Sequence, residues 1–384
     1  MKQQWIRIIF CMLLIAVWVR PAYGAGETEQ SQWEYLQEQT ESLGLQEITE
    51  ELPEETKDYL AKLNLRKLDG RQILSLTPKQ LWLLIKEMFV RGIKAPISLF
   101  GALSAVMLLC AAVQALKSGF HADGLERVFA AVSAMCIMAV ILEPVTQCVQ
   151  RVSQTVQDSA AFLNGYIPVF CGVLTVSGQP ATAGIYHLLL FGASQVIAQA
   201  VSQLIIPLIG IFLAFCFVGA MTPDLSLEKL SSALKKLIGW GLGLMLTVYV
   251  GLLGLQSMVA AGADSITMKT AKFVTSSFIP VIGSALSDAM MTARACLKLL
   301  KTSVGVYGIL IAVLTFLPLF LEILCWYLSA QGAAMLGHLA GAKTPAKLMD
   351  GIADALGILL SIILLFCLLF IISTTIMLIV GAGG

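Results

Sequence analysis

Long runs of apolar residues separated by short polar stretches fill the chain from Pro96 onward. A helix of about 20 apolar residues spans the hydrocarbon core of a bilayer. The long runs cover residues 96–116, 128–148, 184–220, 237–258, 304–330 and 352–380. This pattern predicts an all-α, polytopic membrane domain over residues 95–384. Two shorter runs, at 160–176 and 271–287, each contain a proline.

The run at 184–220 is too long for one simple span. Its middle contains Gln195, Gln199, Gln203 and Pro207. Proline lacks the backbone N–H and clashes with the preceding turn. We therefore expect this helix to bend or break in its Gln/Pro zone.

The amino terminus has the parts of an export signal. A basic start is followed by the apolar run 8–19, which is too short to span a bilayer comfortably, and then by small residues at Ala22 and Gly24. This order predicts a signal peptide over residues 1–24 that is cleaved after Gly24. The alternative is an uncleaved anchor, which Arg20 leaves open. Both readings place the next residues outside the cytoplasm.

The segment 25–94 is predicted to be an exported polar segment with amphipathic helices. Apolar residues recur loosely at helical period over 27–67, and Pro53 is placed to open one of two or three short helices. The segment is either a spacer or a docking surface for another protein. Thr77-Pro78 is a helix start signal, and the mixture of apolar and basic residues over 76–94 predicts an interfacial helix on the outer surface.

Four landmarks recur in the same order in two blocks. They are an Asp-Ser pair followed by Phe, an Ile-Pro-Val motif, an internal Pro-Leu, and Thr-Pro. The recurrence predicts a duplication with halves at about 128–258 and 259–384. The landmarks fall at Asp158, Phe162, Pro168, Pro207 and Thr222 in the first block and at Asp264, Phe273, Pro280, Pro318 and Thr344 in the second.

Short, proline-interrupted segments at matching positions of two halves are typical of membrane transport proteins. Backbone groups freed at such a break must face protein or a water-filled cavity, because lipid offers them no partner. We therefore expect two re-entrant or broken helices, at 160–176 and 271–287, with breaks at Pro168, Pro280 and Gly283. Ordinary kinked spans are the alternative.

Charged residues gather on both sides of the second break. Such groups are costly at membrane depth and often functional there. Either they line a pore or cavity, or they sit at the interface with side chains that reach water. Arg294, Lys298 and Lys301 share one helix face because they are spaced by four and three. The whole cluster is Asp264, Lys269, Lys272, Asp288, Arg294, Lys298 and Lys301.

Loop charges favour one orientation only narrowly. With the first loop outside and both short segments re-entrant, the cytoplasmic side carries slightly more basic residues, as the positive-inside rule requires. The expected cytoplasmic residues are Lys117, Arg127, Lys229, Lys235, Lys236, Lys343 and Lys347. The outside connections carry Arg151, Lys269, Lys272, Arg294, Lys298 and Lys301.

Composition agrees with a membrane protein and narrows the chemistry. The chain is 58% hydrophobic and 13% charged, whereas soluble proteins carry about 25% charged residues. A net charge of +1 gives no argument for nucleic-acid binding. The nine cysteines lack C-x-x-C spacing, so we interpret them as small apolar residues rather than as a metal site or disulfide framework. We expect no cofactor, and no enzyme, because no catalytic motif is recognisable.

The stretch around the second break resembles the stage III sporulation protein AE family of endospore-forming Firmicutes. The order of export signal, polar segment and polytopic body is also similar. The residues that carry the resemblance are Gln256, Asp264, Thr267, Thr270-Ala271-Lys272-Phe273, Phe278-Ile279-Pro280-Val281, Gly283, Leu299-Leu300-Lys301 and Val304-Gly305-Val306.

The resemblance implies a role rather than a chemistry. It implies a multipass component, in the mother-cell membrane around the forespore, of a secretion-like or feeding channel needed after engulfment. The implied partners are other stage III sporulation proteins and, across the intermembrane space, stage II sporulation protein Q. The sequence alone leaves two alternatives, a stand-alone permease for a small solute and a passive membrane scaffold.

Overall fold

The computed structural model describes residues 52–63, 65, 77–117, 123–177, 179–222, 227–278 and 283–380. It describes the backbone only over 256–278 and 283–301 and at 78, 115–117, 123–127, 376–377 and 379–380. These residues belong to one compact unit, and their regular structure is entirely helical. The helices are α4 (Glu54–Lys62), α6 (Pro78–Lys117), α7 (Asp123–Val176), α8 (Pro180–Ala200), η1 (Val201–Ile205), α9 (Ile206–Met221), α10 (Leu227–Phe278), α11 (Gly283–Leu339) and α12 (Lys343–Val380).

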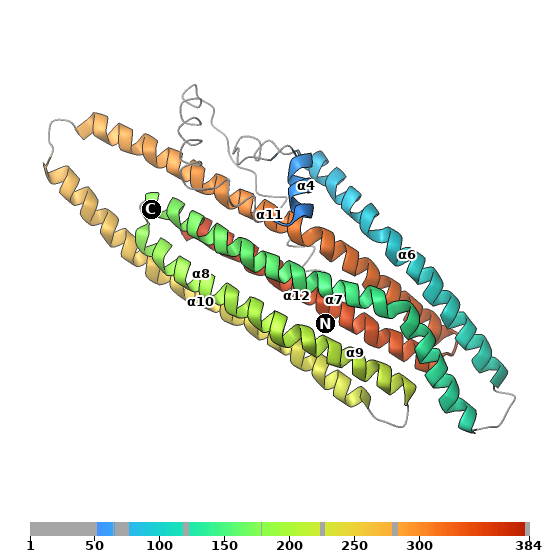
Figure 1. Ribbon diagram of the computed structural model, residues 1–384. Coiled ribbons are helices and arrows are strands. Elements are labelled where there is room, and N and C mark those ends of the chain that lie inside the picture. Colours follow the sequence, from blue (N-terminus) through green and yellow to red (C-terminus); the bar gives the residue numbers. More distant parts are fainter. Residues whose placement is uncertain are drawn as a thin grey trace. The chain divides into compact units, whose positions relative to one another are not determined.

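The long helices run alternately in opposite directions (Figure 1). One end of the bundle holds the joints α6/α7, α9/α10 and α11/α12. The joints α7/α8 and α10/α11 lie toward the opposite end. Within the described residues, six helical runs are long and apolar enough to cross a membrane. The prediction of an all-α, polytopic membrane protein is therefore confirmed. The six runs are Lys79–Gln114, Val128–Val176, Pro180–Met221, Leu227–Leu255, Thr302–Leu339 and Lys343–Thr375.

Helix α12 is the most enclosed of these runs and packs on α7, α9, α10 and α11. In its most apolar stretch 56% of the residues are buried, against 22% in α10. Its Phe370 stacks on Phe162 of α7 with ring centroids 5.4 Å apart, and Phe162 stacks in turn on Tyr166. This aromatic cluster and the aliphatic residues of α12 form the core. Their burial is the main source of stability, because it removes large apolar side chains from water.

Proline does not interrupt α6 or α7. This continuity contradicts two predictions, the break at Pro168 and the helix boundary near Pro96. The predicted break at Pro168 is wrong, because α7 continues through it to Val176. The predicted boundary between an interfacial helix and a first span is also wrong, because α6 runs through Pro96. A proline removes one backbone hydrogen bond, at a cost of about 3 kcal/mol. Packing of buried neighbours such as Phe170 outweighs that cost.

The Gln/Pro zone changes the hydrogen-bond pattern of its helix but does not break it, since the helical run continues from Pro180 to Met221. The predicted break is therefore wrong, and the predicted bend stays a prediction. Residues Val201–Ile205 form a π-helical turn, η1, between α8 and α9. Pro207 lies just after this π turn in the continuous helical run and donates no backbone hydrogen bond to the residues before it. A π turn within a helix often marks a functional or strained position.

The other predicted boundaries fall partly beyond the described residues. Helix α10 ends at Phe278, before Pro280, and α11 begins at Gly283, after it. Pro280 itself lies outside the described residues. The signal peptide over 1–24 also lies outside the described residues. Helix α4 follows Pro53 directly, as expected. The duplication stays a prediction.

Candidate functional site: a charged pocket beneath α4

An ion pair joins α7 to α11 in the middle of two apolar helices. Arg151 of α7 donates to the carboxylate of Glu322 on α11, and its other terminal nitrogen donates to Glu55 of α4 at 3.2 Å. The Glu322 side chain is only 22% exposed. Ionisable groups in membrane helices pair with one another and mark functional sites. This pair is the centre of the candidate site.

Helix α4 covers the pair and contacts three membrane helices. Its buried face includes Thr56, whose hydroxyl hydrogen-bonds the Thr315 hydroxyl of α11 at 3.1 Å. Lys62 donates to Glu87 of α6 at 2.5 Å. With the bond from Arg151 to Glu55, these contacts connect α4 to α6, α7 and α11. Acidic residues in the first turn of α4 and Lys62 in its last turn also suit the helix dipole.

Tyr59 lies on the inner face of α4 and is 7% exposed. Burial raises the pKa of its phenol, and the negative charge of Glu55 raises it further. The phenol therefore stays neutral at physiological pH and remains able to donate a hydrogen bond. The ammonium of Lys62 lies 5.6 Å from the centre of its ring, within the range of a cation–π contact.

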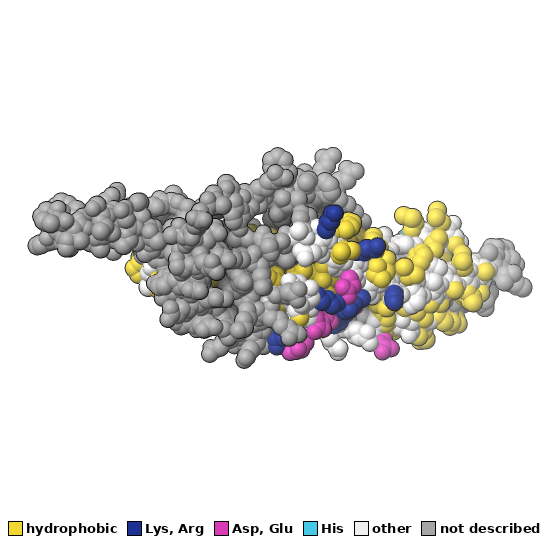
Figure 2. Space-filling view, turned by 90° about the horizontal axis from the view of Figure 1, so that it is seen from above, with side chains coloured by type: hydrophobic (Ala, Val, Ile, Leu, Met, Phe, Trp, Pro, Cys, Tyr) yellow, Lys and Arg dark blue, Asp and Glu magenta, His cyan; other side chains and the backbone are white. Residues whose placement is uncertain are grey.

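These residues surround a pocket of about 250 Å³. Its charged lining has both signs, three carboxylates and two guanidinium groups. Helix α6 lies close to α11 here, since a Cβ on Gly92 would be in van der Waals contact with the Glu322 Cα, at 3.4 Å. Figure 2 shows acidic and basic side chains gathered beside hydrophobic surface on this face of the molecule. The lining is Glu55, Asp58, Tyr59, Met88, Arg91, Gly92, Ala95, Arg151, Pro318 and Glu322.

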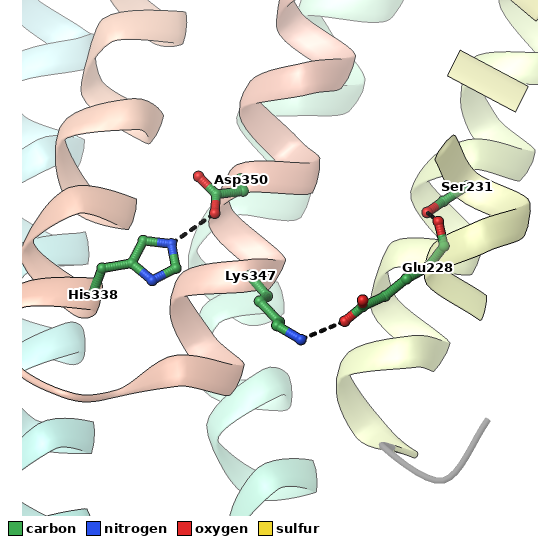
Figure 3. Close-up of polar contacts among 5 residues, drawn as sticks. All are labelled: Glu228, Ser231, His338, Lys347 and Asp350. Carbon is green, nitrogen blue, oxygen red and sulfur yellow. Dashed lines mark hydrogen bonds and ion pairs between the residues drawn. The ribbon is translucent and has the colours of Figure 1, made fainter. Parts of the chain in front are cut away.

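A second group of polar contacts, one ion pair and one hydrogen bond, lies where α11 turns into α12 (Figure 3). Lys347 of α12 pairs with Glu228 of α10 at 2.6 Å, and Asp350 pairs with His338 of α11 at 2.7 Å. All four side chains are at least 41% exposed. Exposed pairs contribute about 0–1 kcal/mol each. We therefore treat this end as a set of surface contacts and use it as a control for the pocket.

The cluster predicted from the sequence falls on two different helices. The backbone places Asp264, Lys269 and Lys272 on α10, and Asp288, Arg294, Lys298 and Lys301 on α11. Their side chains lie outside the described residues, so the polar lining stays a prediction. Of the three predicted break points, Pro168 lies inside α7, Gly283 begins α11, and Pro280 lies outside the described residues.

The sequence analysis missed Glu322 and counted Arg151 only as a loop charge. A signal for Glu322 was available, because it is the single Asp, Glu, Lys or Arg between Lys301 and Lys343. A lone acid in an apolar run of that length predicts a buried partner. Its partner could not be named from the sequence, since α7 and α11 are far apart along the chain.

The residues that line the pocket can bind ions and accept hydrogen bonds. Among the described residues, no three His, Cys, Asp or Glu side chains are placed to hold a metal ion. The cysteines described in the structure are free thiols. The chemistry offered by the pocket is thus charge recognition by carboxylates and guanidinium groups.

Two comparisons with known proteins identify relatives. The family model described as stage III sporulation protein AE matches residues 64–381. Stage III sporulation protein AE of Bacillus subtilis (strain 168) is 26% identical over 333 residues, which cover 81% of this chain and 80% of the relative. No solved structure matches the chain. Since the family model covers all six apolar helices and the pocket residues of α6, α7 and α11, the chain belongs to the stage III sporulation protein AE family.

Proposed function

We propose that this protein is a multipass membrane component of the secretion or feeding channel complex that joins mother cell and forespore after engulfment. The observation that carries the proposal is the family match over residues 64–381, which includes every candidate span. A role in sporulation follows from the family. The channel complex is the finer step proposed here.

The arrangement of α4 supports a role in an assembly. Residues 25–94 are the exported segment in this proposal, and α4 is a described part of that segment seated on the membrane helices. Partners in the intermembrane space could therefore act on the bundle through α4. We propose as partners other stage III sporulation proteins of the same set and, from the forespore side, stage II sporulation protein Q.

The protein acts in this proposal without catalysing a reaction. Its bundle supplies a membrane-embedded scaffold or path, and its pocket supplies fixed charges at one level of that bundle. The protein itself sits in the mother-cell membrane around the forespore, with the turn between α11 and α12 in the cytoplasm. The basic residues at that end, including Lys343 and Lys347, suit a cytoplasmic location.

A deletion followed through sporulation by microscopy tests the proposal. We expect engulfment to finish and the forespore then to stall or shrink, with rescue by the wild-type gene. Purification of the tagged protein from sporulating cells should also recover the proposed partners. Normal sporulation of the deletion strain would contradict the proposal. A changed uptake of a solute in growing cells would point instead to a permease.

Variants at the two charged regions refine the test. Arg151→Ala removes the centre of the pocket, and Lys347→Ala removes one exposed pair at the other end. We expect the first variant to impair sporulation at normal protein level and the second to sporulate normally. Full sporulation of both variants would contradict a functional role of the pocket and favour a passive scaffold.

A further inference from the structure

Three glutamines form a row on the outer side of α8 and η1. Gln195, Gln199 and Gln203 follow one another in steps of four, which places them along one side of the helical run. Gln199 and Gln203 are exposed, whereas Val201 and Ile205 in the same turns are buried against the bundle. The row therefore faces away from the other helices of the chain.

The row lies in the middle of an uncharged membrane helix. Helices α8, η1 and α9 form one continuous run, Pro180–Met221, and residues 159–223 contain no Asp, Glu, Lys or Arg. The parts of the run on either side of the row, 180–194 and 204–221, contain 15 and 18 residues. A span needs about 20 residues. Wherever the bilayer crosses this run, at least one glutamine of the row therefore lies in the hydrocarbon core.

Within the described residues, one of the three amides has a partner. The amide of Gln195 donates to the side-chain oxygen of Asn164 on α7. Gln199 and Gln203 form no hydrogen bond with any residue that the structure describes. Lipid tails accept and donate no hydrogen bonds, so an unpaired amide among them costs free energy. Polar side chains in membrane helices accordingly bond across to another helix.

A second copy of the chain supplies matching groups at the matching depth. A side-chain amide has both donors and an acceptor, so two glutamines can exchange a pair of hydrogen bonds. Two copies inserted in the same orientation are related by a two-fold axis along the membrane normal, and the same surface of each then meets the other. Each residue thus lies at the depth of its own equivalent. Gln199 of one copy can meet Gln199 of the other at whichever level of the bilayer they lie.

The surface beside the row lets another helix approach. Gly192 lies two turns before Gln199 on the same side of α8, and a Cβ there would meet no atom within 4 Å. Small residues let the backbones of membrane helices come close together. Val196 and Leu204 are exposed next to the row and offer apolar contacts around the amides. These residues and the glutamines together form the amide face.

We propose that two copies of this protein associate in the membrane through the amide face, with Gln199 and Gln203 hydrogen-bonding between the copies. The contact satisfies the amides that the single chain leaves without a partner among its described residues. The proposal concerns self-association and does not rest on the channel role.

Disulfide cross-linking in native membranes tests the contact. In a full-length chain whose nine native cysteines are replaced, Gln199→Cys places one thiol on the amide face. We expect an oxidant to join two copies through these thiols, which gives a band of twice the monomer mass on a non-reducing gel. Val248→Cys of α10 is the matched control, because it is exposed at about the same depth. Its depth follows from Gly241, where a Cβ would lie 4.0 Å from the side chain of Ile205, since α10 runs opposite to α9.

The outcomes of the cross-linking separate the possible occupants of the face. Equal cross-linking of the two variants would show random collision, and absence of a Gln199→Cys dimer would show that the face does not lie between copies. Either result overturns the proposal. A cross-link from Gln199→Cys to a chain of another mass, without the dimer, would also overturn it, because the face would then bind a different protein.

Removal of the amides tests the hydrogen bonds themselves. Gln199→Leu combined with Gln203→Leu keeps side chains of similar size, and leucine suits a lipid environment, so each chain should fold normally. The purified proteins carry donor or acceptor dyes at the C terminus, and energy transfer in lipid vesicles measures their association. We expect the double variant to associate about tenfold more weakly, the combined effect of several modest hydrogen bonds between helices. Association as strong as that of the unaltered protein would overturn the proposal, since the amides would then make no contact between copies.

Discussion

Arg151 holds carboxylates from two parts of the chain, Glu322 on α11 and Glu55 on α4. The first contact is the more enclosed, since the Glu322 side chain is 22% exposed and that of Glu55 is 69% exposed. Removing one partner of an enclosed pair leaves the other charge without compensation. Arg151 therefore matters most through its contact with Glu322.

A charge exchange tests that contact. Arg151→Glu and Glu322→Arg should each lower the free energy of unfolding by about 1–3 kcal/mol, between the values typical of exposed and of buried pairs. The double variant should recover most of this loss, because the pair is restored in reverse order. Thermal unfolding of the purified protein in detergent measures all three. Additive losses in the double variant would show that the two side chains do not interact.

Close packing around one glycine predicts how glycine-to-alanine variants change the free energy of unfolding. A Cβ on Gly351 of α12 would lie 2.6 Å from the Cys216 sulfur of α9, whereas a Cβ on Gly239 of α10 would meet no atom within 4 Å. Gly351→Ala should therefore cost about 1–3 kcal/mol through overpacking. Gly239→Ala should be neutral or stabilising, by up to about 1 kcal/mol, because alanine favours helix. The same thermal measurement compares the two, and equal effects would contradict the packing argument.

Only part of the Glu322 contact could be predicted from the sequence. Glu322 is conspicuous as a lone acid in an apolar run, so its importance was predictable. Its partner and the covering by Glu55 depend on how α4, α7 and α11 pack, and helix periodicity alone does not encode that packing.

At the scale of elements, α4 acts as a clamp on α6, α7 and α11. The hydroxyl oxygens of Thr56 and Thr315 are 3.1 Å apart, so cysteines at these positions are within reach of a disulfide. We expect Thr56→Cys with Thr315→Cys to cross-link under mild oxidation, as read by loss of maleimide labelling in mass spectrometry. Thr56→Cys with Ser329→Cys is the control, since Ser329 lies about 20 Å further along α11. Equal cross-linking in both pairs would mean that α4 is not docked as described.

Variants at the prolines of α6 and α7 test whether these helices are continuous. Pro168 is exposed on α7, so Pro168→Ala leaves no cavity and restores a hydrogen bond to the carbonyl of Asn164. We expect the protein to gain stability, by up to about 3 kcal/mol. Pro96 is buried, and Pro96→Ala should gain less because it leaves unfilled space. Loss of folding in Pro168→Ala would support the broken helix that the sequence predicted.

Element boundaries were predictable where local chemistry decides them. Pro53 precedes α4, and the Gln/Pro zone contains the π turn, because both effects are local. Pro96 and Pro168 misled the prediction, since tertiary packing can offset one missing hydrogen bond. Whether a proline ends a helix thus depends on neighbours that are distant in sequence.

At the scale of the whole molecule, the alternating direction of the helices fixes which ends share a side of the membrane. In a background without the nine native cysteines, single cysteines at Leu230 and Leu339 lie near one end of the bundle. A single cysteine at Thr77 precedes α6, at the opposite end of that helix from its joint with α7. In spheroplasts, a membrane-impermeant maleimide should label Thr77→Cys and leave Leu230→Cys and Leu339→Cys unlabelled until the cells are lysed. Labelling of either leucine variant in intact spheroplasts would contradict the up-and-down arrangement or its expected orientation.

The π turn of η1 also has a consequence for the length of the chain. Buried residues follow one another there in steps of four, which in a regular helix of 3.6 residues per turn would drift around the axis. An i→i+5 bond encloses one residue more than an α-helical bond and absorbs the drift. Deleting one codon within 201–205 should therefore turn η1 into regular α-helix and leave the buried faces of α8 and α9 in register. We expect a homologue that is one residue shorter here to keep the same packing. The residues in steps of four are Ile197, Val201, Ile205, Ile209 and Leu213.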